Sequence, residues 1–236
     1  MNRLVQNAIV RFAILIGRVL PRMWGRKVAS WVGRFYGRNK SNPKIQAIRA
    51  NQWVIHDGSI TEEELNEKPK IIFGSAARCM FDFFYYLSRK ERLQDIIDFS
   101  PGAKEACDRI RNDQPCVCVC PHISNFDLMG YALAAQGLEM QVLSYPDPNE
   151  SYKLQNKIRE NLGIIVTPMS LSAFRLAKTR LREGKSVLTG LDRPMEKQPV
   201  NHQPVFFGHP ANLPAAYVRL AIDANAPVII LAATSQ

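Results

Sequence analysis

Strand-like and helix-like segments alternate through the second half of the chain. Short apolar runs predict strands at 116–120, 140–143, 164–168, 186–191 and 228–231, and amphipathic stretches predict helices at 127–136, 152–161, 171–183 and 214–224. Such alternation implies a mostly parallel sheet flanked by helices, with any site at the carboxyl ends of its strands. We therefore expect an α/β domain over residues 112–236.

The most informative stretch follows the first of these strands, where His122 precedes Asp127 by five positions. Residues five apart on one helix point about 140° away from each other, so His122 is expected in the loop and Asp127 in the first turn of the next helix. A carboxylate that orients one imidazole nitrogen lets the other accept a proton. The alternative is structural, because Ser124 and Asp127 form an S-x-x-D helix-start pattern beside an incidental histidine.

The N-terminal part of the chain is strongly basic. The chain has a net charge of +10. Eleven lysines and arginines precede the first acidic residue, Asp57, and beyond it basic and acidic residues are nearly equal in number. Residues 4–20 have apolar side chains at helical spacing, too few to cross a bilayer, and residues 23–38 add tryptophans among arginines. We expect residues 1–56 to be a basic amphipathic membrane-associating arm, and residues 57–111 a helical lead-in.

Two other interpretations of the basic arm remain open at this stage. A nucleic-acid-binding helix has no need of an apolar face such as that of Ile9, Phe12 and Ile16, so we expect no nucleic acid partner. The helix could instead pack on the protein's own core. A secretory signal is disfavoured because arginines interrupt the apolar run.

Aromatic and cysteine residues in the middle of the chain have structural and functional interpretations. The aromatic run within residues 73–87 could line a groove for an apolar chain or form core. Cys116, Cys118 and Cys120 should share one strand face as buried residues, since neighbours two apart on a strand do not easily form a disulfide or a metal shell. Unpaired cysteine spacing suggests a reducing compartment. Of the remaining histidines His209 is the one expected to approach a site at His122.

The chain resembles the lysophospholipid acyltransferase superfamily, specifically its lipid A biosynthesis branch of lauroyl and myristoyl transferases. His122 and Asp127 match the superfamily motif H-x4-[DE]. Three further blocks resemble the branch in the same order: 159–163, 181–193, and 205–211 leading into 219–228. The resemblance implies a glycerolipid-acyltransferase-like fold. It also implies transfer of an acyl chain from a thioester to a hydroxyl, with His122 as the base, Asp127 as its orienting partner and Asn125 in the substrate site.

The resemblance assigns further residues to the substrate site. Asp192 and Arg193 match a family block, D-[QRH]-D, whose second aspartate is replaced here by Pro194; Glu196 could supply that carboxylate. Arg159 falls near a family arginine that supports the transition state, although a solvated arginine on an amphipathic helix is the alternative.

The same resemblance sets expectations for ligands and location. No metal or other cofactor is implied, and the acyl donor would be an acyl carrier protein or coenzyme A thioester. The acceptor would be a membrane lipid similar to a lipid A precursor, met at the cytoplasmic face of the bacterial inner membrane by a peripheral protein. The alternatives are an acyl thioesterase and a non-catalytic membrane-surface protein, the latter suggested by Pro194. Family members continue beyond residue 231, so we expect C-terminal elements to be missing.

Overall fold

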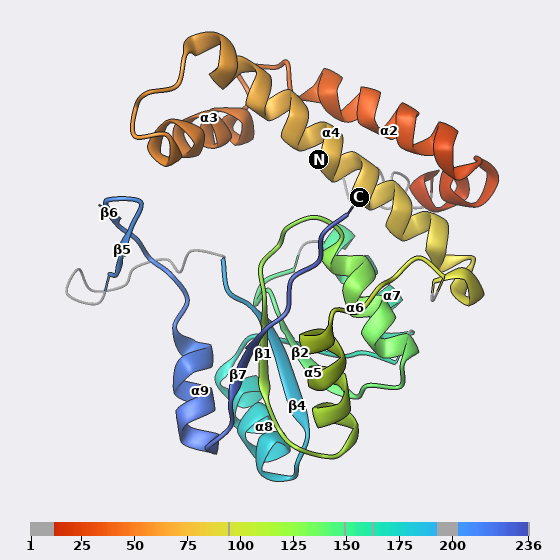
Figure 1. The fold of residues 1–236 in the computed structure, drawn as a ribbon, viewed down its shortest axis with the longest axis vertical. Helices are drawn as coiled ribbons and strands as arrows, with labels where there is room; N and C mark the ends of the chain where they lie inside the picture. Colours follow the sequence, from red (N-terminus) through yellow and green to blue (C-terminus); the bar gives the residue numbers. More distant parts are fainter. Residues whose placement is uncertain (1–11, 94, 149, 162, 193–202, 236) are drawn as a thin grey trace. The chain divides into compact units, whose positions relative to one another are not determined.

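The computed structural model describes residues 12–93, 95–148, 150–161, 163–192 and 203–235. These residues group into two compact units (Figure 1). A helical unit holds residues 12–89 together with 203–211, and an α/β unit holds the described residues of 90–192 and 212–235. Each unit has its own packing.

A five-stranded parallel sheet forms the centre of the α/β unit, in the order β3-β2-β4-β1-β7. Its strands are β1 (Val117–Cys120), β2 (Met140–Ser144), β3 (Ile165–Pro168), β4 (Ser186–Gly190) and β7 (Val228–Ile230). Each strand begins and ends within two residues of the predicted range. The parallel α/β sheet predicted from the sequence is therefore confirmed.

Helices cover both faces of this sheet. They are α5 (Pro101–Arg111), α6 (Phe126–Ala135), α7 (Glu150–Glu160), α8 (Leu171–Arg182) and α9 (Ala216–Ala224), and a short 3-10 turn (Lys90–Arg92) precedes them. One apolar cluster joins α5 and α6 to the sheet, and a second joins α8 and α9 to the sheet. Strand β1 contributes side chains to both clusters, because Cys118 faces the first and Val117 and Val119 face the second.

The predicted role of the strand cysteines agrees with this packing. Cys116, Cys118 and Cys120 are all buried as free thiols. The sulfur atoms of Cys116 and Cys118 lie 3.6 Å apart on the same face. The hydrogen bond to Cys116 and burial both raise the pKa of the Cys118 thiol, so it stays protonated.

The helical unit contains a helix at residues 12–19, followed by α2 (Arg22–Tyr36), α3 (Pro43–Ile55) and α4 (Glu62–Leu87). Residues 1–11 of the predicted first helix lie outside the described residues. Thr61 caps α4 in a capping box with Glu64. The apolar face of the aromatic run is largely core, since Phe81, Phe83, Phe84 and Tyr86 are buried on α4.

A hairpin of β5 (Val205–Phe206) and β6 (His209–Pro210) also belongs to the helical unit. It turns at Phe207 and Gly208, which both have positive φ, as a two-residue hairpin loop requires. Its short strands were not predicted. Among the described helices, none has both the length and the apolar character needed to cross a bilayer.

Candidate active site

The register between β1 and β4 brings His122 and Asp192 together. Cys120 pairs with Gly190 at the carboxyl ends of these adjacent parallel strands. His122 and Asp192 each lie two residues beyond that pair, so they emerge side by side at one edge of the sheet. The sequence predicted that both would reach this edge, and the structure confirms it.

His122 is held by both oxygen atoms of the Asp192 carboxylate. Its Nδ1 lies 2.6 Å from Oδ1, and its backbone N–H donates to Oδ2 at 2.6 Å. Both side chains remain partly accessible, with exposed fractions of 26% and 33%. Burial alone would raise the pKa of Asp192, but the hydrogen bonds from His122 lower it below its ordinary value.

This contact determines which imidazole nitrogen is available. An ionised Asp192 can only accept, so Nδ1 carries the hydrogen, and in the neutral ring Nε2 carries the lone pair. The ring is also packed edge-to-face against Phe126, with centroids 4.6 Å apart. An oriented imidazole with an unprotonated Nε2 can remove a proton from a bound hydroxyl.

Asp127 lies in the first turn of α6, as the sequence predicted, and its carboxylate is bonded to Arg159 of α7. Arg159 also donates to Asn156 at 2.8 Å, and its guanidinium lies 5.4 Å from the centre of the Tyr152 ring. It is a largely buried arginine, which differs from the solvated alternative. Burial would lower the pKa of Arg159, but Asp127 raises it above its ordinary value and keeps it charged.

The carboxylate bonded to His122 in this structure is therefore that of Asp192, and Asp127 is bonded to Arg159. The role of Asp127 as the orienting partner stays a prediction. Asn125 occupies the N-cap position of α6, next to the site, without a capping side-chain hydrogen bond. Its expected role in substrate binding likewise stays a prediction.

The predicted cap at Ser124 is wrong. Ser124 lies one residue before the N-cap, has a φ of 50°, and donates its hydroxyl hydrogen to Ser235 at 3.0 Å. The loop between β1 and α6 needs a left-handed residue to turn the chain, and Ser124 supplies it. The S-x-x-D pattern therefore does not describe how this helix begins.

Cys120 is a poor candidate for a nucleophile. It is buried, and its thiol donates to the backbone carbonyl of Pro121 at 3.2 Å. Burial, with the nearby carboxylates of Asp192 and Asp127, raises the pKa of Cys120 to about 11. The thiolate, which is the reactive form, is therefore scarce near neutral pH.

Gly190 lies against the ring of His122, a contact that the sequence did not reveal. A Cβ atom at this position would lie 2.7 Å from Cε1 of His122, closer than carbon atoms approach without a shift. The imidazole therefore rests against the backbone at the end of β4. The sequence did contain one sign of this close approach, a glycine near the end of a predicted strand and two residues before Asp192.

Three residues of the expected substrate site, Arg193, Pro194 and Glu196, lie outside the described residues. His209 lies on the exposed hairpin of the helical unit. Its predicted approach to the site stays a prediction.

A histidine held by a carboxylate at the carboxyl edge of a parallel sheet is an arrangement that can support proton transfer. The chain belongs to the family of bacterial lipid A biosynthesis acyltransferases, which matches residues 3–234. This match confirms the resemblance noted from the sequence. A search of curated proteins finds no match to the chain. The family points to an acyltransferase that takes lipid and acyl thioester substrates.

Proposed function

We propose that this protein is a membrane-associated O-acyltransferase that moves a fatty acyl chain from a thioester to a hydroxyl of a lipid or glycolipid. The donor would be acyl carrier protein or coenzyme A, and the acceptor a lipid A precursor or a similar glycolipid. The observation that carries the proposal is the 2.6 Å contact between His122 Nδ1 and Asp192 Oδ1, because it leaves Nε2 free to act as a base.

The proposed reaction has two steps. His122 Nε2 removes the hydroxyl hydrogen of the acceptor while the hydroxyl oxygen attacks the thioester carbonyl carbon. The tetrahedral intermediate then collapses, its carbon–sulfur bond breaks, and the leaving thiolate takes the proton from the imidazolium. The Asp192 carboxylate stabilises the imidazolium that forms between the steps, and His122 is regenerated unchanged.

Asp127 and Arg159 have a supporting role in this proposal. Their ion pair is largely withdrawn from solvent, with exposed fractions of 18% and 14%. It ties the first turn of α6 to α7, and so fixes the loop that carries His122. We place Asn125 and Arg193 on the substrate side, as the resemblance implies, and Glu196 there as the replacement for the second aspartate of the family block.

The membrane part of the proposal is supported by α2. The large apolar residues Trp24, Trp31 and Phe35 are exposed on this helix. The helical unit as a whole is basic, with thirteen lysines and arginines and six acidic residues. An exposed apolar face on a basic helical unit is typical of a protein that lies in a membrane interface. We propose the cytoplasmic face of the bacterial inner membrane as its location.

The test is acyl transfer in detergent from a thioester labelled in its acyl group. Acyl carrier protein and coenzyme A donors are each offered with a lipid A precursor, a glycolipid and a lysophospholipid. Labelled lipid and free fatty acid are measured separately for wild type, His122→Ala and the matched control His56→Ala, whose imidazole belongs to the helical unit.

We expect transfer by wild type and His56→Ala, and a loss of roughly 100-fold or more in His122→Ala. Undiminished transfer in His122→Ala would exclude His122 as the base. Release of free fatty acid without any acyl lipid would instead identify a thioesterase. A folded wild type that performs neither reaction would favour the non-catalytic alternative.

A further inference from the structure

Helix α2 packs on α4 through glycine. Gly25 and Gly33 are buried, and a Cβ atom on either would overlap the ring of Phe81 or the carbonyl of Phe73 on α4. A Cβ atom on Gly37, just after α2, would lie 2.7 Å from Cα of Lys70. The two helices therefore meet nearly backbone to backbone, and the interface has no room for the large side chains of α2.

Those large side chains lie on the solvent side of α2. Trp24, Val28, Trp31 and Phe35 are spaced at four, three and four residues, so they share one face of the helix. Their exposed fractions are 59%, 49%, 68% and 63%. A helix that buries glycine and exposes tryptophan has the reverse of the usual arrangement, which indicates that this face contacts something other than the protein's own core.

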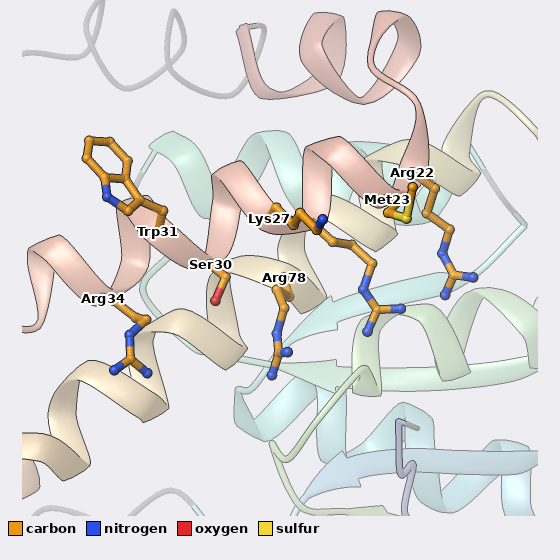
Figure 2. Close-up of a pocket in the computed structure, with 8 residues that line it drawn as sticks. Arg22, Met23, Lys27, Ser30, Trp31, Arg34 and Arg78 are labelled. Atoms are coloured by element: carbon orange, nitrogen blue, oxygen red, sulfur yellow. The ribbon is translucent and has the colours of Figure 1, made fainter.

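A basic groove follows the boundary between this face and α4 (Figure 2). Its volume is about 680 Å³, and it is lined by Arg22, Met23, Arg26, Lys27, Ser30, Trp31, Arg34 and Arg78. In Figure 2 the side chains of Ser30, Arg34 and Arg78 extend to one side of α2, and that of Trp31 extends to the other. The groove therefore has guanidinium groups beside an aromatic rim.

Carboxylates neutralise part of the charge in this groove. Asp82, which is 1% exposed, pairs with Arg22 at 3.3 Å and Arg26 at 3.7 Å. Glu67 lies 3.7 Å from Arg34.

Two of the cations that line the groove lack such a partner. Within the described part of the chain, Lys27 and Arg78 have no carboxylate within 4 Å. The groove thus retains a surplus of positive charge, and part of it is held in place by the buried carboxylate of Asp82.

We propose that this groove binds the phosphate headgroup of an anionic phospholipid while the exposed face of α2 rests in the membrane interface. Arginine and lysine donate to phosphate oxygens, Ser30 adds a hydroxyl, and tryptophan is favoured at the headgroup level. The inference extends the proposed membrane association by naming the surface and the lipid group that it recognises. It does not depend on turnover at His122.

A lipid fits this surface better than a free phosphate or a nucleic acid. Free phosphate would account for the cations but not for the exposed apolar side chains of Val28, Trp31 and Phe35. A nucleic acid could stack on tryptophan, but it gains nothing from the aliphatic residues beside it. An anionic bilayer satisfies both the charged groove and the apolar face.

The test is flotation of the full chain with vesicles of phosphatidylcholine alone and with phosphatidylglycerol added. The groove variant is K27Q/R78Q, which removes the two cations without a carboxylate partner. The matched control is K104Q/R175Q, which removes the same charge from exposed positions on α5 and α8 of the α/β unit. Circular dichroism verifies that each variant is folded, and the single variant K27Q replaces the double one should it fail to fold.

We expect wild type to prefer phosphatidylglycerol vesicles, and K27Q/R78Q to lose roughly tenfold or more of that partitioning. K104Q/R175Q should bind nearly as well as wild type. Trp31→Ser should weaken binding to both vesicles, because the rim contributes apolar contact. His122→Ala should bind like wild type, so that a failure of the catalytic proposal and a failure of this one are distinguishable.

Several outcomes would overturn the proposal. Equal loss in the groove and control variants would indicate attraction by net charge without a site. Displacement by millimolar inorganic phosphate, with no preference for anionic vesicles, would indicate a free-phosphate site. Tight binding of single-stranded DNA that competes with vesicles and is lost in K27Q/R78Q would assign the groove to nucleic acid.

Discussion

At the scale of single residues, the orientation of one imidazole depends on both neighbouring strands. Asp192 bonds the ring and the backbone N–H of His122, and Gly190 lets the ring lie against the end of β4. Phe126 packs against it from the start of α6. The geometry leaves Nε2 as the nitrogen that can accept a proton.

Gly190→Ala should displace the imidazole, because the new methyl group would meet Cε1 of His122. A shift of about 1 Å at a reacting group can cost roughly 100-fold in rate. We expect kcat to fall by about that factor with little change in KM for the thioester. Gly102→Ala on α5, where a Cβ meets nothing within 4 Å, is the control and should retain wild-type kcat. Equal rates in both variants would contradict the positioning role.

Asp192 should contribute acid-sensitive stability. Its folded-state pKa lies below the ordinary value, so the unfolded chain binds the proton more tightly. The contribution is therefore fully present above about pH 4 and is lost as pH falls through the lower folded-state pKa. The melting temperatures of wild type and Asp192→Asn should differ by a constant amount above about pH 5, and the difference should shrink below about pH 4.

The exposed Asp98→Asn in the same unit is the matched control. Its melting curve should stay close to that of wild type at every pH. A difference between wild type and Asp192→Asn that grows on acidification would have the wrong sign for this account.

At the scale of elements, the close packing of α2 on α4 depends on glycines, which have no side chain at the interface. Gly33→Ala should force the helices apart, since its Cβ would overlap the carbonyl of Phe73, and overpacking of this kind costs about 1–3 kcal/mol. Urea unfolding followed by tryptophan fluorescence measures this directly, because all three tryptophans, Trp24, Trp31 and Trp53, lie in the helical unit.

Gly130→Ala, in the interior of α6, provides the matched control because a Cβ there meets nothing within 4 Å. This substitution should be neutral or stabilising by up to about 1 kcal/mol when followed by circular dichroism. A stabilised Gly33→Ala variant would show that the close approach of α2 and α4 is not needed.

Element positions in the α/β unit followed closely from the sequence, because buried apolar runs and amphipathic stretches alternate without ambiguity. The start of α6 was less predictable. Ser124 has a capping pattern, yet its positive φ moves the cap to Asn125. The hairpin at 205–210 was missed because its strands have two residues each and its turn is Phe-Gly, a weak hairpin signal.

At the scale of the whole molecule, the candidate site depends on strand order, which the sequence does not specify. His122 and Asp192 were both expected at the carboxyl edge of the sheet. Their direct contact requires β4 to lie beside β1, although β2 and β3 come between them in the chain. Asp127 is nearer in sequence and was the natural choice for a partner. Glycines in and just after α2 could have indicated close packing, since Gly33 and Gly37 are four residues apart.

We propose that His122 and Asp192 act together as the catalytic pair of the acyltransferase. The most direct measurement is the initial rate of acyl transfer in Asp192→Asn and Asp127→Asn against wild type. We predict that Asp192→Asn loses roughly 100-fold or more, because an amide can present its N–H to Nδ1 and so favour the wrong tautomer. A near-normal rate in Asp192→Asn together with an inactive Asp127→Asn would contradict the account and return the orienting role to Asp127.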